Sequence, residues 1–416
     1  MNKKLIIALQ CAAALYLTAP ANAANPNNFS DTTHAYSMPL FVGLASNKVG
    51  LSWTETDASG IKHLYWAVSA DQGKTYSDKK LIYASTGLSS SRLMRAKVLA
   101  KKDGSLVAIF GLNPPTVAPK ADAHAGHDHA NHGAKTETAP AKPARGGRPS
   151  DLQIVYSESK DGGNTWSAPQ TVHQDKTPKI IRGFYDSALM SNDEIAVAFL
   201  KDTGKPHERD LRIITSENGK FGEERVIDPF VCDCCNVSLL TDNTGKLNIY
   251  YRSNIKNIRD IAHMVSADHG KTFSKPAIVL NDKWEINGCP HSGPVSASGN
   301  AGNLVSWFSA TPDSPGVRVA TQQGKKLFVL KPEASNPFLA SNGKNTLMLW
   351  EEAETSGDRS VVLQTIGEKQ TKQGESKKVS TGTNPTGIAS GNTLWIASEV
   401  PGQGSKKSIQ LTAVKL

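Results

Sequence analysis

Ser69-Ala-Asp71-Gln-Gly73-Lys-Thr75-Tyr76 decides the fold, because two further segments of the chain are near-copies of it. The copies are Ser159-Lys-Asp161-Gly-Gly163-Asn-Thr165-Trp166 and Ser266-Ala-Asp268-His-Gly270-Lys-Thr272-Phe273. In each copy, the Asp begins a tight hairpin and can accept hydrogen bonds from the backbone N–H groups of its own turn. The Gly supplies the positive φ that the turn needs. The final aromatic residue is expected to pack as an apolar plug between neighbouring sheets.

This repeat resembles the Asp box, or BNR repeat, of the sialidase-like β-propellers. Weaker copies occur at 216–221 and near 321–324, so the resemblance extends over nearly the whole chain after its leader. It implies an all-β fold, a β-propeller of four-stranded antiparallel blades. Asp71, Asp161 and Asp268 are expected to hold their turns without touching a ligand. The boxes are structural, and a fold alone does not establish an activity.

A four-strand unit recurs around the boxes, and its second strand ends on an aromatic residue. Once a long insert is set aside, these residues recur at the spacing of propeller blades; they are Trp53, Phe110, Phe199, Tyr251, Trp307, Trp350 and Trp395. Seven such residues predict seven blades, with six as the alternative if one weak C-terminal unit is misread. The last unit shows only three strands, so a strand around Thr32–Tyr36 is expected to complete it and close the ring.

The start of the chain has the pattern of a secretory signal. Lys3 and Lys4 precede an apolar run, and a small-residue cleavage site ends at Ala23. The run is too short to cross a bilayer. Residues 24–416 are therefore expected to form a single monomeric propeller domain in the periplasm or outside the cell, without membrane insertion. The net charge of +9 comes from scattered Lys and Arg residues, so no nucleic-acid partner is expected.

An insert at about 113–148 interrupts the second unit and is rich in Ala, Pro, Gly, Lys and His. It lacks the apolar residues of a core and is expected to be a disordered loop. Four imidazoles lie close together in it: His124, His127, His129 and His132. Such a group suits copper, zinc or nickel and predicts an auxiliary metal-capture site. A solvated linker is the alternative interpretation.

Cysteines precede the first strands of two successive units. Cys232, Cys234 and Cys235 come before the fourth unit, and Cys289, followed by His291, comes before the fifth. Equivalent positions in successive blades are neighbours in space, so we expect four sulfurs and an imidazole to meet at the channel mouth. The His-rich insert joins the second and third strands of its unit and should share this face. Thiolates favour Cu(I) and imidazoles accept Cu(II) or zinc, which predicts a copper site with zinc as the alternative metal.

Disulfides are the competing interpretation, because the same cysteines would be exported to an oxidising compartment. A bridge between Cys234 and Cys235, or within Cys232-x-Cys234, would strain normal disulfide geometry. The easier pairing joins Cys232 to Cys235 and Cys234 to Cys289. Neither alternative is decided by the sequence.

Sialidases use an arginine triad, a tyrosine nucleophile paired with a glutamate, and an aspartate acid. Their early Arg-Ile-Pro motif is absent here, and the nearest stand-ins are Arg92, Arg95, Arg182, Arg252, Tyr185 and Asp186. Polar residues that line a wet channel are the favoured interpretation of this set. No catalytic residue is therefore assigned, and an enzyme, if the chain is one, would be a sialidase-like glycoside hydrolase.

The function predicted from the sequence is copper handling by an exported propeller, with a metal ion and a further periplasmic metal-handling protein as partners. Two alternatives remain. The first is a sialidase-like exo-glycosidase or another carbohydrate-active propeller. The second is a non-catalytic protein-interaction scaffold with structural disulfides.

Overall fold

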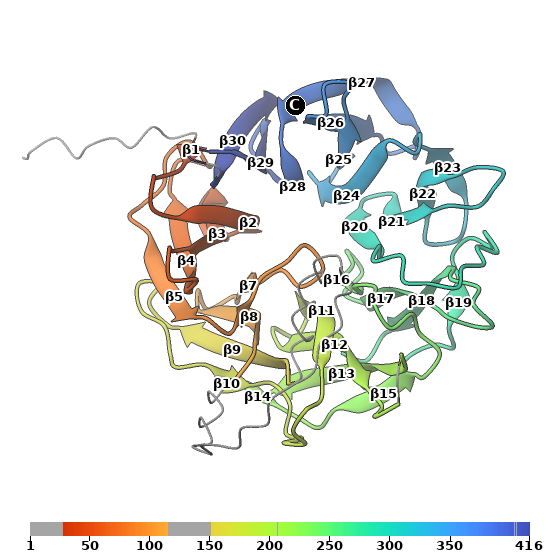
Figure 1. Ribbon diagram of the computed structural model, residues 1–416, viewed down its shortest axis with the longest axis horizontal. Coiled ribbons are helices and arrows are strands. Elements are labelled where there is room, and N and C mark those ends of the chain that lie inside the picture. Colours follow the sequence, from red (N-terminus) through yellow and green to blue (C-terminus); the bar gives the residue numbers. More distant parts are fainter. Residues whose placement is uncertain (1–27, 115–150, 206, 403, 405) are drawn as a thin grey trace, which may run out of the picture.

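The computed structural model describes residues 28–114, 151–205, 207–402, 404 and 406–416. The described strands form seven antiparallel sheets that stand side by side around a central channel (Figure 1). This arrangement confirms the predicted seven-bladed β-propeller of four-stranded antiparallel blades. No helix in the described ranges has the length and apolar character that a membrane span would need.

In each blade the chain runs from the strand beside the channel to the strand at the periphery. The first three blades contain β2 (Ala35–Gly43), β3 (Val49–Thr56), β4 (Lys62–Ser69) and β5 (Lys80–Ser85); β6 (Leu88–Ser89), β7 (Lys97–Ala100), β8 (Leu106–Leu112), β9 (Gln153–Ser159) and β10 (Gln170–Thr171); and β11 (Arg182–Leu189), β12 (Ile195–Asp202), β13 (Arg209–Glu217), β14 (Lys220–Phe221) and β15 (Arg225–Asp228). The inner strand of the second blade is split into β6 and β7, and the outer strand of the third into β14 and β15. A short 3-10 helix, Ala45–Asn47, joins β2 to β3.

The remaining blades repeat this order without split strands. They contain β16 (Ser238–Thr241), β17 (Leu247–Arg252), β18 (Ile261–Ser266) and β19 (Ala277–Ile278); β20 (Val295–Gly299), β21 (Gly302–Ser309), β22 (Gly316–Thr321) and β23 (Lys326–Val329); β24 (Ala334–Ser341), β25 (Thr346–Ala353), β26 (Arg359–Ile366) and β27 (Lys372–Thr381); and finally β28 (Thr383–Ser390), β29 (Thr393–Pro401) and β30 (Lys407–Lys415) with β1 (Asn28–Phe29).

The ring is closed by the pairing of the first described strand with the last. Phe29 of β1 lies opposite Ile409 of β30. The prediction from the sequence placed the closing strand at Thr32–Tyr36, which is a few residues too late, because β2 already begins within that range. The Asp31 carboxylate provides the physical reason. It accepts a hydrogen bond from the backbone N–H of His34 (2.6 Å) and so turns the chain between β1 and β2.

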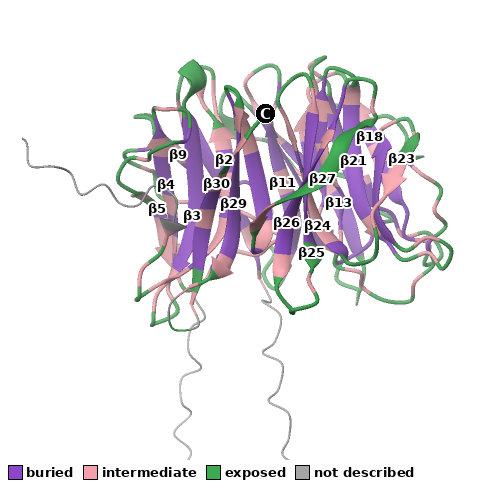
Figure 2. Ribbon diagram, turned by 90° about the horizontal axis from the view of Figure 1, so that it is seen from above, coloured by how far each residue is buried: buried purple, intermediate pink, exposed green. Residues whose placement is uncertain are grey.

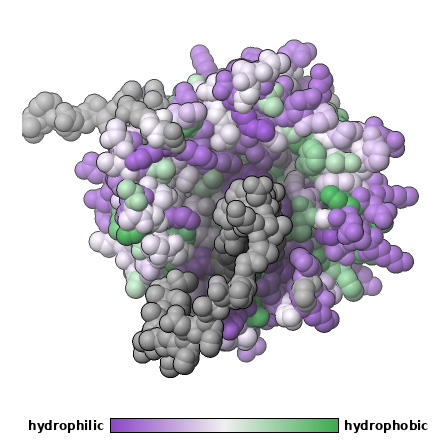
Figure 3. All heavy atoms as spheres, in the orientation of Figure 1, coloured by the Kyte–Doolittle hydropathy of each residue, from purple (hydrophilic) through white to green (hydrophobic). Residues whose placement is uncertain are grey.

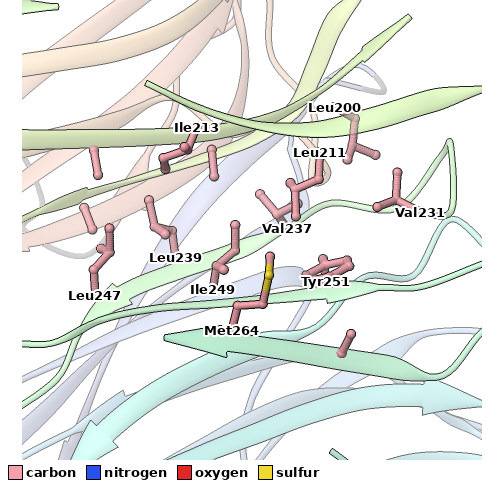
Figure 4. Packing of buried hydrophobic residues seen from close by; sticks show 14 of the residues in the cluster. Leu200, Leu211, Ile213, Val231, Val237, Leu239, Leu247, Ile249, Tyr251 and Met264 are labelled. Carbon is pink, nitrogen blue, oxygen red and sulfur yellow. The ribbon is translucent and has the colours of Figure 1, made fainter. Parts of the chain in front are cut away.

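The second strand of a blade is packed between two neighbouring sheets and is therefore buried on both faces. Figure 2 shows buried strands as purple bands between exposed loops. All six residues of β17 are buried, and so are all seven aromatic residues that predicted the blades. Figure 4 shows the cluster between the third and fourth blades, where Leu211 and Ile213 pack with Ile249, Tyr251 and Met264. Burial of such side chains is the main stabilising term of the fold.

The Asp boxes form the hairpins between third and fourth strands, as predicted. Asp161 accepts hydrogen bonds from the hydroxyl and the backbone N–H of Thr165 (2.7 and 2.9 Å). These bonds lower the pKa of Asp161 to about 2. Gly163 has a φ of 97°, and a Cβ added to it would lie 2.2 Å from Nε1 of Trp66 in the first blade. Trp166 packs edge-on against the same ring, so the box also joins two blades.

The inner strands of four blades carry a β-bulge with one residue at positive φ; these residues are Met38, Phe184, Asn336 and Asn384. Two of the bulges bind a buried carboxylate of the preceding blade. Glu399 accepts a hydrogen bond from the backbone N–H of Met38 (2.9 Å), and Glu351 accepts one from Asn384 (2.6 Å). The bulges therefore connect adjacent blades close to the channel.

Candidate functional site

A cavity of about 490 Å³ occupies the channel and is bounded by the inner strands of the blades. Its wall combines apolar and cationic side chains, among them Phe41, Val98, Leu239, Leu339, Arg92, Arg95 and Lys97. Figure 3 views the molecule in the same direction as Figure 1 and shows mostly hydrophilic residues around the visible rim of this face. The cavity thus has a mixed apolar and polar wall that includes three cationic side chains, and its volume is within the size range of ligand pockets.

The positive charge comes from a loop of the second blade. Residues 90–96, between β6 and β7, project toward the middle of the ring (Figure 1). Arg92 donates a hydrogen bond to the carbonyl oxygen of His291 (3.1 Å), which precedes the fifth blade. Arg95 donates one to the carbonyl oxygen of Asn384 (3.2 Å) in the seventh blade. The loop therefore reaches across the channel and brings two guanidinium groups into the cavity.

Neither of these arginines has a carboxylate within ion-pairing distance among the described residues. The Nε atom of Arg95 is buried, and none of the described groups accepts its hydrogen bond. Burial lowers the pKa of Arg95 to about 10, which leaves it charged at neutral pH, and the nearby charge of Glu399 opposes the shift. Lys97 differs, because its ammonium pairs with Asp186 at 2.8 Å. Arg92 and Arg95 are therefore the two cations of the cavity wall that have no carboxylate partner among the described residues.

Tyr185, the nearest stand-in for a sialidase nucleophile, is unsuited to that role. Tyr185 is 4% exposed and belongs to the apolar cluster between the second and third blades. Burial raises the pKa of its hydroxyl. Asp186 accepts hydrogen bonds from Lys97 of the second blade and from the backbone N–H of Leu239 in the fourth (2.8 Å each). The two residues border the channel as expected, but they join blades and are not poised for attack.

The other two arginine stand-ins lie apart from the cavity. Arg182 is buried and pairs with Asp175 at 2.8 Å. The Arg252 guanidinium donates to the carbonyl oxygens of Ser292, Arg259 and Phe308. Among the four arginines, only the pair on the channel loop is therefore available to a ligand in the cavity.

The structure brings the four described cysteines together, as predicted. Cys232 Sγ lies 3.7 Å from Cys234 Sγ and 3.3 Å from Cys235 Sγ, and all three residues are buried. The three sulfurs lie within 4.8 Å of one another. Cys289 is half-buried, and its sulfur lies within the same distance of Cys234 Sγ and a carboxylate oxygen of Asp233. All four cysteines are free thiols.

Backbone and side-chain contacts fix the segment that carries these thiols. The backbone N–H of Cys232 donates to the carbonyl oxygen of Arg252 (2.9 Å). Asn236 accepts from the backbone N–H of Gly293 (3.1 Å) and so ties this segment to the one that carries Cys289. Arg209 of the third blade donates to the carbonyl oxygen of Asp233. Neighbouring blades thus hold the sulfurs in place.

The environment of the thiols differs from one to the next. Hydrogen bonds from Cys234 and Cys235 lower the pKa of Cys232, and the charge of Arg259 acts in the same direction. The same contact with Cys232 raises the pKa of Cys234. Burial raises the pKa of Cys235, which the charge of Arg252 partly offsets. Cys232 is therefore the first of the three to form a thiolate.

His291 is not part of this cluster among the described residues. His291 is exposed and lies outside the groups of potential ligand atoms around the sulfurs. His124, His127, His129 and His132 lie outside the described residues. A different imidazole comes close: Nδ1 of His207 lies 3.7 Å from a carboxylate oxygen of Asp233.

Sequence reasoning missed His207, Asp233 and Arg259 as neighbours of the cysteines. His207 and Arg259 lie in loops between second and third strands, at 203–208 and 253–260. Loops between second and third strands emerge on the same face as the segments that precede first strands, where the cysteines lie. The predicted topology could therefore have placed His207 and Arg259 near the cysteines.

Comparison with known proteins supports the fold and leaves the function open. A family model for a BNR repeat-like domain matches residues 142–306. No curated protein sequence matches the chain. The matched segment includes two of the three Asp boxes and the cysteine segment.

Solved structures resemble the chain over almost its full length at low sequence identity. A protein of unknown function from Dyadobacter fermentans has a TM-score of 0.56 at 12% identity, with 94% of this chain and 97% of that chain covered. The intramolecular trans-sialidase from Ruminococcus gnavus has 0.50 at 13%, with 95% and 98% covered. An ulvan lyase, a polysaccharide lyase, has 0.56 at 10%, with 94% and 95% covered. With its Asp boxes and its ring of blades, the chain is a seven-bladed β-propeller with BNR-type repeats, and its fold is similar to that of the sialidases.

Proposed function

We propose that the channel cavity binds an anionic saccharide that carries a carboxylate or sulfate group. The observation that carries this proposal is the pair Arg92 and Arg95, which lines the cavity without a carboxylate partner among the described residues. A guanidinium presents its N–H donors as a planar fork that matches a carboxylate or a sulfate. A ligand of this kind would supply the acceptor that the buried Nε of Arg95 lacks.

The apolar side chains of the cavity wall suit the less polar faces of a sugar ring, and Arg92 and Arg95 would orient its acidic group. Two of the similar structures hold ligands of this chemistry: the trans-sialidase contains oseltamivir carboxylate, and the ulvan lyase contains a saccharide of GlcA and Rha3S. These likenesses favour the carbohydrate-active alternative of the sequence analysis over copper handling, for which the comparisons give no support.

The proposal concerns binding and assigns no nucleophile. Tyr185 is enclosed in the core, and Asp186 is held by Lys97 and by the backbone of the fourth blade. A sialidase mechanism through these two side chains would need them to leave those contacts. A carbohydrate-binding propeller is the function that the geometry supports best.

The test is calorimetric titration of the mature chain with N-acetylneuraminic acid and with a glucuronate-containing oligosaccharide, and with N-acetylglucosamine as the neutral sugar. We expect an acidic saccharide to bind and the neutral sugar not to bind. Arg95→Gln removes one charge-assisted interaction and should weaken binding about 10- to 100-fold. Arg225→Gln is the matched control, because Arg225 is exposed and contacts the Asp-box hairpin of the fourth blade. Equal affinity for acidic and neutral sugars, or for the two variants, would contradict the proposal.

A further inference from the structure

The cysteine cluster is a second feature of the same face, and the proposed saccharide site does not use it. Three buried sulfurs, those of Cys232, Cys234 and Cys235, surround one point, with two of their separations at 3.3 and 3.7 Å. Three thiolates bound to one metal ion at about 2.3 Å would lie about 4 Å apart in a trigonal planar arrangement, so the sulfurs would have to move apart by less than about 1 Å. From this geometry we infer that the three cysteines form a binding site for one Cu(I) ion.

The site is held in shape before any ion enters. Its segment is tied to the third blade through Arg209 and to the fifth through Asn236, while Cys232 is bound to the backbone at Arg252. These hydrogen bonds hold the segment that carries the sulfurs against the third, fourth and fifth blades. Held ligands lose little conformational freedom when they bind, which favours tight binding.

The charges around the cluster fit a metal–thiolate centre. Three thiolates and one Cu(I) ion carry a net charge of −2, which a buried site accepts only if cations lie nearby. Arg252 and Arg259 are buried next to the sulfurs and have no carboxylate within ion-pairing distance among the described residues. The Nε and Nη1 atoms of Arg259 also have no hydrogen-bond acceptor there. An anionic copper–thiolate centre would compensate both guanidinium charges.

The number of sulfurs favours Cu(I) over zinc. Structural zinc sites are almost always four-coordinate, but Cys289 lies near Cys234 and Asp233 and does not belong to the group of three. Cu(I) is a soft ion that prefers thiolates, and three thiolates can complete its coordination. Cys289 is half-buried and lies instead beside the buried group, next to the buried Asp233, so that an ion can reach the three sulfurs from its side. Binding then forms three Cu–S bonds and releases three thiol protons to solvent.

The experiment titrates the mature chain with Cu(I), supplied anaerobically as its bathocuproine disulfonate complex, after the protein is reduced and the reductant removed. We expect four free thiols and one Cu(I) per chain. Cys234→Ser should lower the affinity more than about 100-fold, beyond the loss caused by removing a partner outside the ligand shell. X-ray absorption of the wild-type copper complex should show sulfur ligands alone, a result that does not depend on how any variant folds.

Two controls separate this site from the other candidates. His291→Ala, and a variant with His124, His127, His129 and His132 all changed to Ala, should each retain the Cu(I) bound to sulfur. Arg95→Gln should weaken saccharide binding and leave Cu(I) binding unchanged, so that the two proposals fail independently.

Three results would overturn the inference. The first is no copper uptake by the reduced protein although four free thiols are counted. The second is zinc bound in preference to Cu(I). The third is an equal loss of affinity in Cys289→Ser and Cys234→Ser, which would indicate a site of four sulfurs.

Discussion

Asp71 shows how a single carboxylate fixes the local structure that defines this fold. It accepts hydrogen bonds from the backbone N–H and the hydroxyl of Thr75 (2.8 and 2.7 Å) and from the hydroxyl of Ser69 (2.7 Å). The Ser69 oxygen in turn accepts from the backbone N–H of Gly73 (2.6 Å). The residues of this network, Ser69, Asp71, Gly73 and Thr75, occupy the positions at which all three copies of the repeat are identical.

Replacing Asp71 with Ala should therefore destabilise the protein by about 1–2 kcal/mol, because several donors lose one shared acceptor. Chemical denaturation with urea measures the change. Asp78→Ala is the control, since Asp78 is an exposed Asp in the same hairpin and its carboxylate accepts none of the described hydrogen bonds. A loss of stability as large in the control would show that the network has no special role.

Single residues also show what the sequence could not provide. The position of Tyr185 beside the channel follows from the repeat, but the direction of its side chain into the core depends on the bulge at Phe184. Conversely, Cys234 and Cys289 could be predicted to meet, because they precede the first strands of successive blades. Positions follow from topology, whereas side-chain direction follows from local backbone irregularities that leave little trace in the sequence.

Among the structural elements, the Asp-box hairpin has a second role as a contact between blades. Gly163 lies against Trp66 of the first blade, and Gly73 lies against Trp395 of the seventh. A Cβ on Gly73 would come within 2.6 Å of the Trp395 ring. The glycine of the repeat is thus required by its neighbour as well as by its own turn.

Gly162 and Gly163 allow the requirement of the turn to be tested separately from that of the neighbouring blade. Gly162 and Gly163 both have positive φ, 71° and 97°, but a Cβ on Gly162 would contact nothing within 4 Å. Gly162→Ala should cost roughly 1 kcal/mol from backbone strain. Gly163→Ala should cost about 1–3 kcal/mol more, because the added methyl overpacks the contact with Trp66. Equal midpoints of urea unfolding in the two variants would refute the inter-blade role.

The loop at residues 90–96 is the element that the sequence did not reveal. Arg92 and Arg95 were placed on the channel face from the order of the strands, but their reach to the fifth and seventh blades depends on hydrogen bonds to the carbonyl groups of His291 and Asn384. Any residue offers such a carbonyl, so no side-chain pattern marks these contacts.

For the whole molecule, the number of blades followed from aromatic residues at blade spacing, because each ring fills the space between two sheets. The closing strand was misplaced by a few residues, since a strand as short as Asn28–Phe29 carries too little periodicity to be seen. The cavity depends on all the inner strands at once and could not be predicted from any single unit.

The stability of the whole ring should depend on pH through the buried His173 and the half-buried His263. Burial lowers the pKa of His173 and of His263 from 6.5 to about 4. The unfolded chain therefore binds more protons than the folded one between these values, and stability should fall as the pH drops from about 6.5 to about 4. The melting temperature measured across this range tests the expectation.

The double variant His173→Gln/His263→Gln should show a shallower decrease than the wild type when both are referred to their own values at pH 7.5. His263 stacks on Tyr250 and contacts Asn248, so the variant is expected to be less stable at every pH. An unchanged slope in the variant would mean that other groups cause the acid sensitivity.

The pairing of β1 with β30 has a consequence for how the molecule is made. The first strand to emerge during synthesis has no partner until the last one has been released, so six blades can assemble while the seventh waits. During that interval the ring has a gap flanked by unpaired strand edges, which attract other chains. A chain cut short by only its final ten residues would lose all of β30 and would keep that gap permanently. In the intact protein, β1 and β30 close the ring together, so closure requires both of these strands.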